Sequence, residues 1–276
     1  MRDIYSGARK VSAWLGPDPS GDASQVVAII KRMAELHQAE LNPNTDMFPS
    51  NQVLAQLRLP AQESPVWESF NRMVALRYFT RVWIIQEIFL ADAFELLWGQ
   101  ATIPGTDFRL AYSWIHYNYL CYCHYGLYPS SSILDITRCS ALWVQNKDLM
   151  ELMNGTLGFE STDKRDRIFA LVGLVPKSEC DIVVDYKKTE AEVYAEPALH
   201  IISKSNKLDV LNFTSLQDAP DVNCPVWVPI WKDYDPGTLL DFKFKATKNR
   251  CAVQWKGLGF EVLILRSLHV DSLESV

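Results

Sequence analysis

The alternation of apolar and polar positions predicts an amphipathic helix over residues 22–41. Apolar side chains recur there at the spacing of one helix face, namely at Val26, Ile29, Ile30, Met33 and Leu36. Asp22 or Ser24 can cap its first turn, and the turn-forming residues 42–44 end it. One side of this helix is therefore expected to pack on a core.

The same patterns predict strands alternating with helices along the first part of the chain. Strands are expected at 11–15 and 94–98, with helices opened by Ser64 and Pro65, at 79–91 and at 107–123. Strands separated by helices are typical of an α/β fold with a parallel sheet.

The rest of the chain is expected to be more helical. A long helical stretch is predicted at 133–153, and Thr189 and Glu192 have the offset of a capping box, which opens a helix to about Ser203. The segment beyond Pro225 is interpreted as loops and strands. The sequence thus predicts an α/β front, a mostly helical middle and a mixed α+β tail.

Residues 80–90 hold the first candidate site, because this segment is apolar in every direction when placed on a helix. Glu87 lies within it, and a buried carboxylate must be paired, protonated or face a cleft. Trp83 lies on the same side of the helix, so a carboxylate beside an aromatic wall is a candidate functional group. A simpler interpretation, which the spacing alone favours, is that Glu87 pairs with Arg77, Arg81 or a backbone donor and only fixes the helix.

A charged run forms the second candidate site, made of Asp163, Lys164, Arg165, Asp166 and Arg167. It precedes the apolar residues 168–171. One interpretation is a charged helix start, with Asp163 as the cap and acidic residues at the positive end of the helix. The other is a charge latch between subdomains. The pattern slightly favours the helix start.

Composition excludes several functional classes. The net charge of −6, without a basic stripe, argues against nucleic acid as a partner. The six scattered cysteines indicate the reduced thiols of a cytoplasmic protein, and Cys121, Cys123 and His124 lack the second ligand pair of a metal site. No apolar run has the length of a membrane span. Phosphate-binding glycine loops, nucleophile elbows and zinc helices do not occur in the sequence.

Several blocks of the sequence resemble the fungal heterokaryon-incompatibility (HET) family. Arg81, Trp83, Gln86 and Glu87 fit R-x-W-x-x-Q-E, the closing block of the HET domain. Residues 163–171 resemble a D-P-R-D-R-I-F-A-L segment that follows it, with Lys164 in place of proline. Shorter matches include Ile4 and Tyr5, residues 14–16, residues 185–187 and residues 227–229.

The opening blocks of the family, among them I-D-A-x-C-I-N-Q, do not occur in this sequence. The resemblance therefore implies that residues 1–100 are the C-terminal half of an N-terminally truncated HET domain. Residues 101–276 then correspond to the helical and mixed region that follows such domains.

HET domains in turn resemble Toll/interleukin-receptor (TIR) domains, so the expected front is the remnant of a TIR-like parallel sheet flanked by helices. The resemblance implies a module of non-self recognition and programmed cell death that acts through protein partners, with self-association as an option. By the TIR likeness, Glu87 would cleave NAD as a glycohydrolase, with Trp83 lining the pocket. A non-catalytic module without a cofactor is the favoured interpretation, and an inactive remnant is the third.

Overall fold

The computed structural model describes residues 2–41, 49–117, 148–156, 158–205, 209–213, 225, 227–229 and 231. The chain divides into two compact units. The first unit comprises Met1–Lys147 with Gly158–Ser161, and the second comprises Asp148–Leu157 with Thr162–Val276. The boundary expected at residue 100 rests on the family resemblance and stays a prediction.

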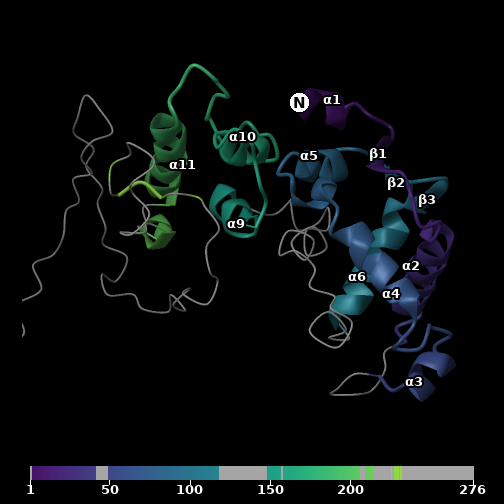
Figure 1. The fold of residues 1–276 in the computed structure, drawn as a ribbon. Helices are drawn as coiled ribbons and strands as arrows, with labels where there is room; N and C mark the ends of the chain where they lie inside the picture. The colour runs from purple at the N-terminus through teal and green to yellow at the C-terminus, as the bar shows by residue number, and fades with distance from the viewer. Residues whose placement is uncertain are drawn as a thin grey trace, which may run out of the picture. The chain divides into compact units, whose positions relative to one another are not determined.

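The first unit is built on a three-stranded mixed sheet (Figure 1). The strands β1 (Val11–Gly16), β2 (Phe94–Trp98) and β3 (Ala101–Pro104) lie in the order β1-β2-β3. β1 and β2 are parallel, whereas β2 and β3 form an antiparallel hairpin. Both strands predicted from the sequence are confirmed, and β3 was not predicted because its four residues carry little pattern.

The two faces of this sheet differ in burial. One face is buried and consists of Ala13, Leu15, Phe94, Leu96, Trp98 and Ile103. The helices α2 (Ala23–Gln38) and α6 (Gly105–Tyr117) contact the strands. Gly105 opens α6 against this face, where an added Cβ atom would clash with the Phe94 ring. The other face carries Ser12 and Trp14, which are exposed.

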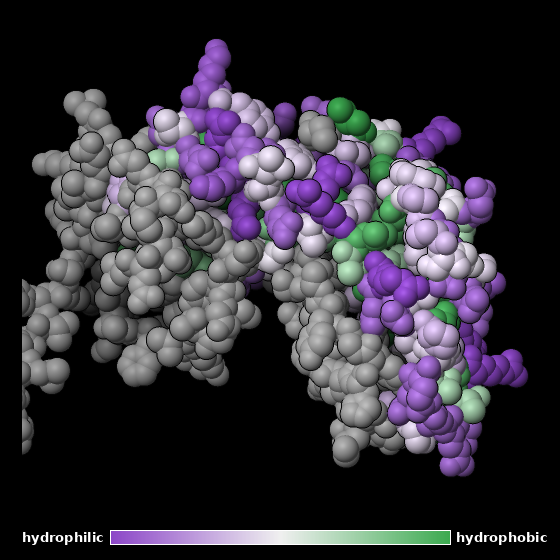
Figure 2. Space-filling model, in the orientation of Figure 1, coloured by the Kyte–Doolittle hydropathy of each residue, from purple (hydrophilic) through white to green (hydrophobic). Residues whose placement is uncertain are grey.

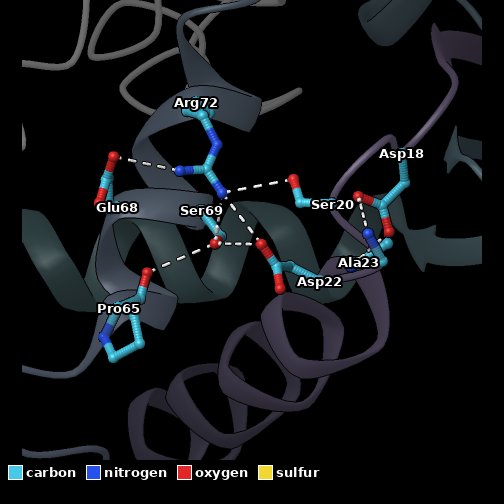
Figure 3. A network of polar contacts seen from close by, with 9 residues as sticks. Asp18, Ser20, Asp22, Ala23, Pro65, Glu68, Ser69 and Arg72 are labelled. Carbon is cyan, nitrogen blue, oxygen red and sulfur yellow. Dashed lines mark hydrogen bonds and ion pairs between the residues drawn. The ribbon is translucent and has the colours of Figure 1, made fainter.

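A polar network joins the start of α2 to α4 (Pro65–Val74) (Figure 3). Asp22 occupies the N-cap position of α2, but its side chain does not cap the helix. It accepts hydrogen bonds from the Ser69 hydroxyl at 2.8 Å and from Arg72 at 2.9 Å. Asp18 accepts from the Ala23 backbone N–H at 2.8 Å instead. The predicted helix is therefore confirmed, but Asp22 serves the packing of two helices rather than the predicted cap.

The prediction of one continuous helix at 79–91 is wrong. The structure has a short 3-10 helix, η1 (Arg77–Thr80), and then α5 (Ile84–Phe89). Between them Arg81 is extended and forms a parallel β-bridge with Glu160, and Val82 donates its N–H to the Glu160 carbonyl at 2.9 Å. A pairing partner distant in sequence outweighs the local helical pattern here. The first unit also contains α1 (Arg2–Ser6) and α3 (Asn51–Gln56), of which α3 was not predicted.

In its described part, the second unit is helical. It contains α9 (Leu149–Asn154), α10 (Asp166–Val172), α11 (Glu190–Ser205) and the 3-10 helix η3 (Asp209–Phe213). The capping box is confirmed, since Thr189 donates its N–H to Glu192 at 2.7 Å and accepts from the Glu192 N–H at 3.3 Å. Pro197 lies inside α11 without ending it.

The protein is thus mixed α/β, with a sheet packed against helices followed by a helical region, as the sequence predicts. Some expectations fall outside the described residues. These are the stretch 133–147, the cysteine group around Cys121 and most of the tail predicted as strands beyond Pro225.

Candidate functional site

Glu87 is held by two tyrosine hydroxyl groups. Tyr78 donates to Glu87 Oε2 at 3.1 Å, and Tyr5 donates to Oε1 at 3.4 Å. The carboxylate is half-buried in α5, and each of its oxygens accepts one phenol. Glu87 is therefore paired, as expected for a carboxylate on a largely buried segment, but the partners are phenols rather than Arg77 or Arg81.

Tyr78 is the more firmly held of the two donors. Its ring stands edge-on to Phe79, with ring centroids 5.3 Å apart, and Phe79 stacks on Phe108. Burial raises the pKa of Tyr78 far above its usual value, and the negative charge of Glu87 and the hydrogen bond to it raise that pKa further. The phenol therefore keeps its proton and remains a donor.

Tyr5 fastens α1 to the rest of the first unit. α1 contributes no buried residue, and its Ile4 is 66% exposed. Figure 2 shows apolar surface, in green, over the region of α1 and α5. Burial and then the charge of Glu87 raise the pKa of Tyr5, although this side chain is less buried than Tyr78. No local pattern joins Tyr5 to Glu87, because 82 positions separate them in the chain.

The Glu87 cluster lies on the amino side of the parallel strands. α1 leads into β1 and α5 leads into β2, and the Val11 N–H donates to the Ala93 carbonyl at 2.9 Å where both strands begin. In open α/β sheets, ligands bind beyond the carboxyl ends of the strands. At that end Gly99, with φ +57°, approaches so closely that a Cβ atom there would lie 2.7 Å from Asp18 Cβ.

The other residues of the closing block have different environments. Gln86 is buried at 1% exposure, Trp83 is half-buried at the start of α5, and Arg81 is exposed. The positive charge of Arg81 acts on the two tyrosines, lowering the pKa of each slightly against the larger effects that raise it. The structure thus brings Arg81 and Glu87 to the same tyrosine pair.

The second candidate site is centred on Arg165. Its Nε and NH2 donate to the two oxygens of Asp163 at 2.9 and 2.7 Å. Its NH1 donates to the backbone carbonyls of Tyr186 at 2.7 Å and Lys188 at 2.9 Å. The Arg165 hydrogen bonds lower the pKa of Asp163. One guanidinium group therefore ties the start of α10 to the segment that precedes α11.

Tyr186 completes this second cluster. Its hydroxyl donates to Asp166 Oδ1 at 2.6 Å, its ring stands edge-on to Phe169, and the Arg165 guanidinium lies over that ring at 5.3 Å. Burial and then the hydrogen bond to Asp166 raise the pKa of Tyr186.

The predicted cap at Asp163 is wrong, because Arg165 holds the N-cap position of α10 and Asp163 accepts the Arg165 N–H at 3.0 Å. Arg167 donates to the Trp231 carbonyl at 2.8 Å. All of these partners belong to the second unit. The charged run therefore links segments within that unit.

Neither site has the features of a metal centre. Across residues 2–41, 49–117 and the other described ranges, no group of three histidine, cysteine or acidic side chains could hold a metal ion. In the same described part of the chain, no helix is both long and apolar enough to cross a membrane.

The first part of the chain, from α1 through β1 to the Glu87 segment in α5, matches a known family. Residues 1–87 match the family model of the heterokaryon incompatibility protein (HET), so this part of the chain is a HET domain. The match ends at Glu87, the last residue of the closing block.

The chain is also distantly homologous to a named incompatibility protein. It is 26% identical over 281 residues to heterokaryon incompatibility protein 6, OR allele, of Neurospora crassa. The alignment covers 84% of this chain and 41% of the relative, so the chain spans less than half the length of the curated relative it matches. No solved structure matches the chain.

Proposed function

We propose that this protein is a signalling module of fungal heterokaryon incompatibility, acting through protein partners in non-self recognition and programmed cell death. The observation that carries the proposal is the HET match over residues 1–87, together with the incompatibility protein related to most of the chain. The relative is named for heterokaryon incompatibility, and we extend that role to this chain.

The surroundings of Glu87 support a non-catalytic role. A general acid, base or ribose-binding carboxylate needs an oxygen directed at the substrate. Both oxygens of Glu87 accept phenolic hydrogen bonds, and the cluster lies away from the carboxyl ends of the parallel strands. At those carboxyl ends the positive charge of Arg72, which a dinucleotide phosphate would need, is already paired with Asp22 at 2.9 Å, and Asp18 adds a second carboxylate near the start of α2.

NAD cleavage is the second candidate function, and one observation favours it. Glu87 is a half-buried carboxylate four residues after a half-buried Trp83, in a segment that fits W-x-x-x-E. Displacement of Tyr5, which holds Glu87 through a 3.4 Å hydrogen bond, would free one carboxylate oxygen. The third candidate is an inactive remnant of a HET protein.

One experiment separates these functions. The full chain is expressed from an inducible promoter in a filamentous fungus, and colony survival is scored. In parallel, the purified chain is mixed with NAD and released nicotinamide is measured. Variants Glu87→Gln and Arg165→Lys test the two clusters, and Glu68→Gln, an exposed carboxylate of the same unit, is the matched control.

The proposal expects loss of viability on induction, no release of nicotinamide, and toxicity that survives Glu87→Gln. Nicotinamide release that Glu87→Gln abolishes and Glu68→Gln preserves would instead establish the enzyme. Full viability with a folded wild-type chain would leave the inactive remnant and overturn the signalling role.

A further inference from the structure

The backbone of Glu160 supports the segment that leads to Glu87. Its N–H donates to the Thr80 carbonyl at 2.6 Å, and its carbonyl accepts the Val82 N–H at 2.9 Å. Its side chain also accepts a hydrogen bond from the Thr80 hydroxyl at 3.2 Å. These contacts keep Arg81 extended between η1 and α5. The path of the chain into α5, and with it the position of Glu87, therefore depends on Glu160.

Glu160 lies between two fixed points of the chain. Before it, Phe159 is 1% exposed, so close packing holds that side chain. After it, Asp163 accepts hydrogen bonds from the Nε, NH2 and backbone N–H of Arg165. Only two residues separate Glu160 from Asp163, and three residues of chain span at most about 10 Å. The positions of Glu160 and Asp163 are therefore not independent.

Residues 158–165, here called the strap, connect the two candidate sites through the chain itself. Residues 158–161 belong to the first unit, and the chain re-enters the second unit directly after them. At the far end of the strap, Arg165 also donates to the Tyr186 carbonyl at 2.7 Å and the Lys188 carbonyl at 2.9 Å. One end of the strap thus supports the Glu87 segment, and the other end holds the segment that precedes α11.

The Arg165 end of the strap is the more strongly bonded. The Arg165 guanidinium makes four hydrogen bonds, two of them to the charged oxygens of Asp163. Hydrogen bonds to an ionised partner are roughly twice as strong as neutral ones. The Glu160 end depends on two backbone hydrogen bonds and one exposed side-chain contact. The guanidinium contact therefore fixes the strap, and the Glu160 bridge follows it.

We propose that the strap couples the two candidate sites as a conformational device. While Arg165 holds Asp163, Glu160 stays bridged to the chain before α5. When that hold is lost, the bridge loosens and Glu87 becomes more accessible. Coupling between two sites is reciprocal, so loss of the Glu160 bridge must also loosen the backbone that Arg165 holds.

This coupling goes beyond the proposed function and can be tested on the purified protein alone. It concerns local opening of backbone hydrogen bonds, which is compatible with separate unfolding transitions of the two units. Absence of coupling would leave the incompatibility role standing, and a chain without activity in the fungus could still show the coupling. The two proposals therefore fail independently.

The first test measures amide hydrogen exchange of the full chain by mass spectrometry. Arg165→Ala, a change in the second unit, should speed exchange in peptides covering residues 78–89 about threefold or more. Exchange within α2 should stay unchanged and serves as the internal reference for an intact first unit. Asp163→Asn removes the charge that Arg165 binds but keeps the side-chain shape, so it should give a smaller change in the same direction.

Lys204→Ala is the matched control for this first test. Lys204 also belongs to the second unit and donates to a backbone carbonyl, that of Glu179 at 2.9 Å, but it does not contact the strap. It should leave exchange at residues 78–89 unchanged. If Arg165→Ala loosens α2 as well, the comparison of Asp163→Asn with Lys204→Ala decides. Unchanged exchange at 78–89, or an equal increase with Lys204→Ala, would overturn the proposal.

The second test runs in the opposite direction along the strap. Glu160→Pro removes the N–H that donates to Thr80. Trypsin should then cleave the folded protein at Lys187 or Lys188 about threefold faster, although both lysines lie in the second unit. Glu160→Gln keeps the backbone N–H and should be cleaved at nearly the wild-type rate. Equal cleavage of Glu160→Pro and Glu160→Gln would contradict the coupling.

Discussion

The two candidate sites share a local arrangement. In each, a tyrosine ring stands edge-on to a fully buried phenylalanine, and the tyrosine hydroxyl donates to a carboxylate. The residues are Phe79, Tyr78 and Glu87 in the first unit and Phe169, Tyr186 and Asp166 in the second.

They differ in the role of the nearby arginine. Arg165 binds Asp163 through two nitrogens, holds two backbone carbonyls and lies over the Tyr186 ring. Arg81 is exposed, and the hydrogen bonds of Glu87 come from neutral phenols. An arginine of a family motif therefore organises backbone in the second unit, whereas in the first unit the carboxylate is held by tyrosines instead. We expect the Arg165 cluster to be structural and the Glu87 cluster to be displaceable.

The largest loss of folding stability should come from removing the phenylalanine that packs against each tyrosine. Phe79→Ala and Phe169→Ala each leave a cavity in a packed core and should cost about 3–5 kcal/mol. Differential scanning calorimetry should show Phe79→Ala lowering the transition of the first unit and Phe169→Ala that of the second. A single transition that both substitutions shift equally would mean that the units unfold together and would weaken the comparison.

Arg165→Ala should loosen the segment that precedes α11, because its carbonyls lose the guanidinium group that holds them. We expect trypsin to cleave the folded protein at Lys187 or Lys188 about tenfold faster. Arg165→Lys keeps the charge but loses the forked geometry, so it should give an intermediate rate. Arg81→Lys is the control. Equal protection in wild type and Arg165→Ala would show that other contacts hold this segment.

Stability at alkaline pH should reveal the raised pKa of Tyr78. The folded protein raises the pKa of Tyr78, so it keeps this proton at a pH where the unfolded chain has lost it. The stabilising contribution is therefore complete below about pH 10 and declines as pH rises towards the folded-state pKa. Urea unfolding midpoints above about pH 9 should fall less steeply in Tyr78→Phe than in wild type. Parallel slopes would show that Tyr78 is not protected in the folded state.

The smallest effect should come from Tyr5→Phe. Its hydrogen bond to Glu87 is 3.4 Å long and joins a helix with no buried residue, so its loss should cost no more than about 0.5 kcal/mol. Tyr78→Phe, measured beside it at neutral pH, should cost about 1–2 kcal/mol. Equal losses in chemical denaturation would mean that α1 is as firmly attached as the core.

The periodicity of apolar residues was sufficient to predict the helices and strands whose buried side chains follow a local pattern. The helix α2, the strands β1 and β2 and the capping box at Thr189 and Glu192 carry that pattern in their own residues. The break at Arg81 could not be predicted, because its cause is a bridge to Glu160 across 79 positions of sequence.

For the site residues too, the local pattern predicts some features, whereas contacts distant in sequence decide the others. Placing Glu87 on a mainly buried segment predicts that it is paired, protonated or facing a cleft, and in the structure it is paired with two tyrosines. Its donors could not be named, since Tyr5 reaches it only through the tertiary fold. Similarly, the charged run marks Arg165 as notable, but its carbonyl partners belong to backbone that has no sequence signature.

The bridge between Arg81 and Glu160 also has a consequence for biosynthesis. Residues 158–161 complete the first unit, although residues 148–157 of the second unit precede them in the chain. A ribosome must therefore translate past Glu160 before η1 and α5 acquire their backbone partner, and the HET domain cannot mature as soon as residue 87 emerges. A shortened transcript that ends after residue 87 but before Glu160 would encode the whole matched HET segment. It would lack the Glu160 backbone that pairs with Arg81 and Val82.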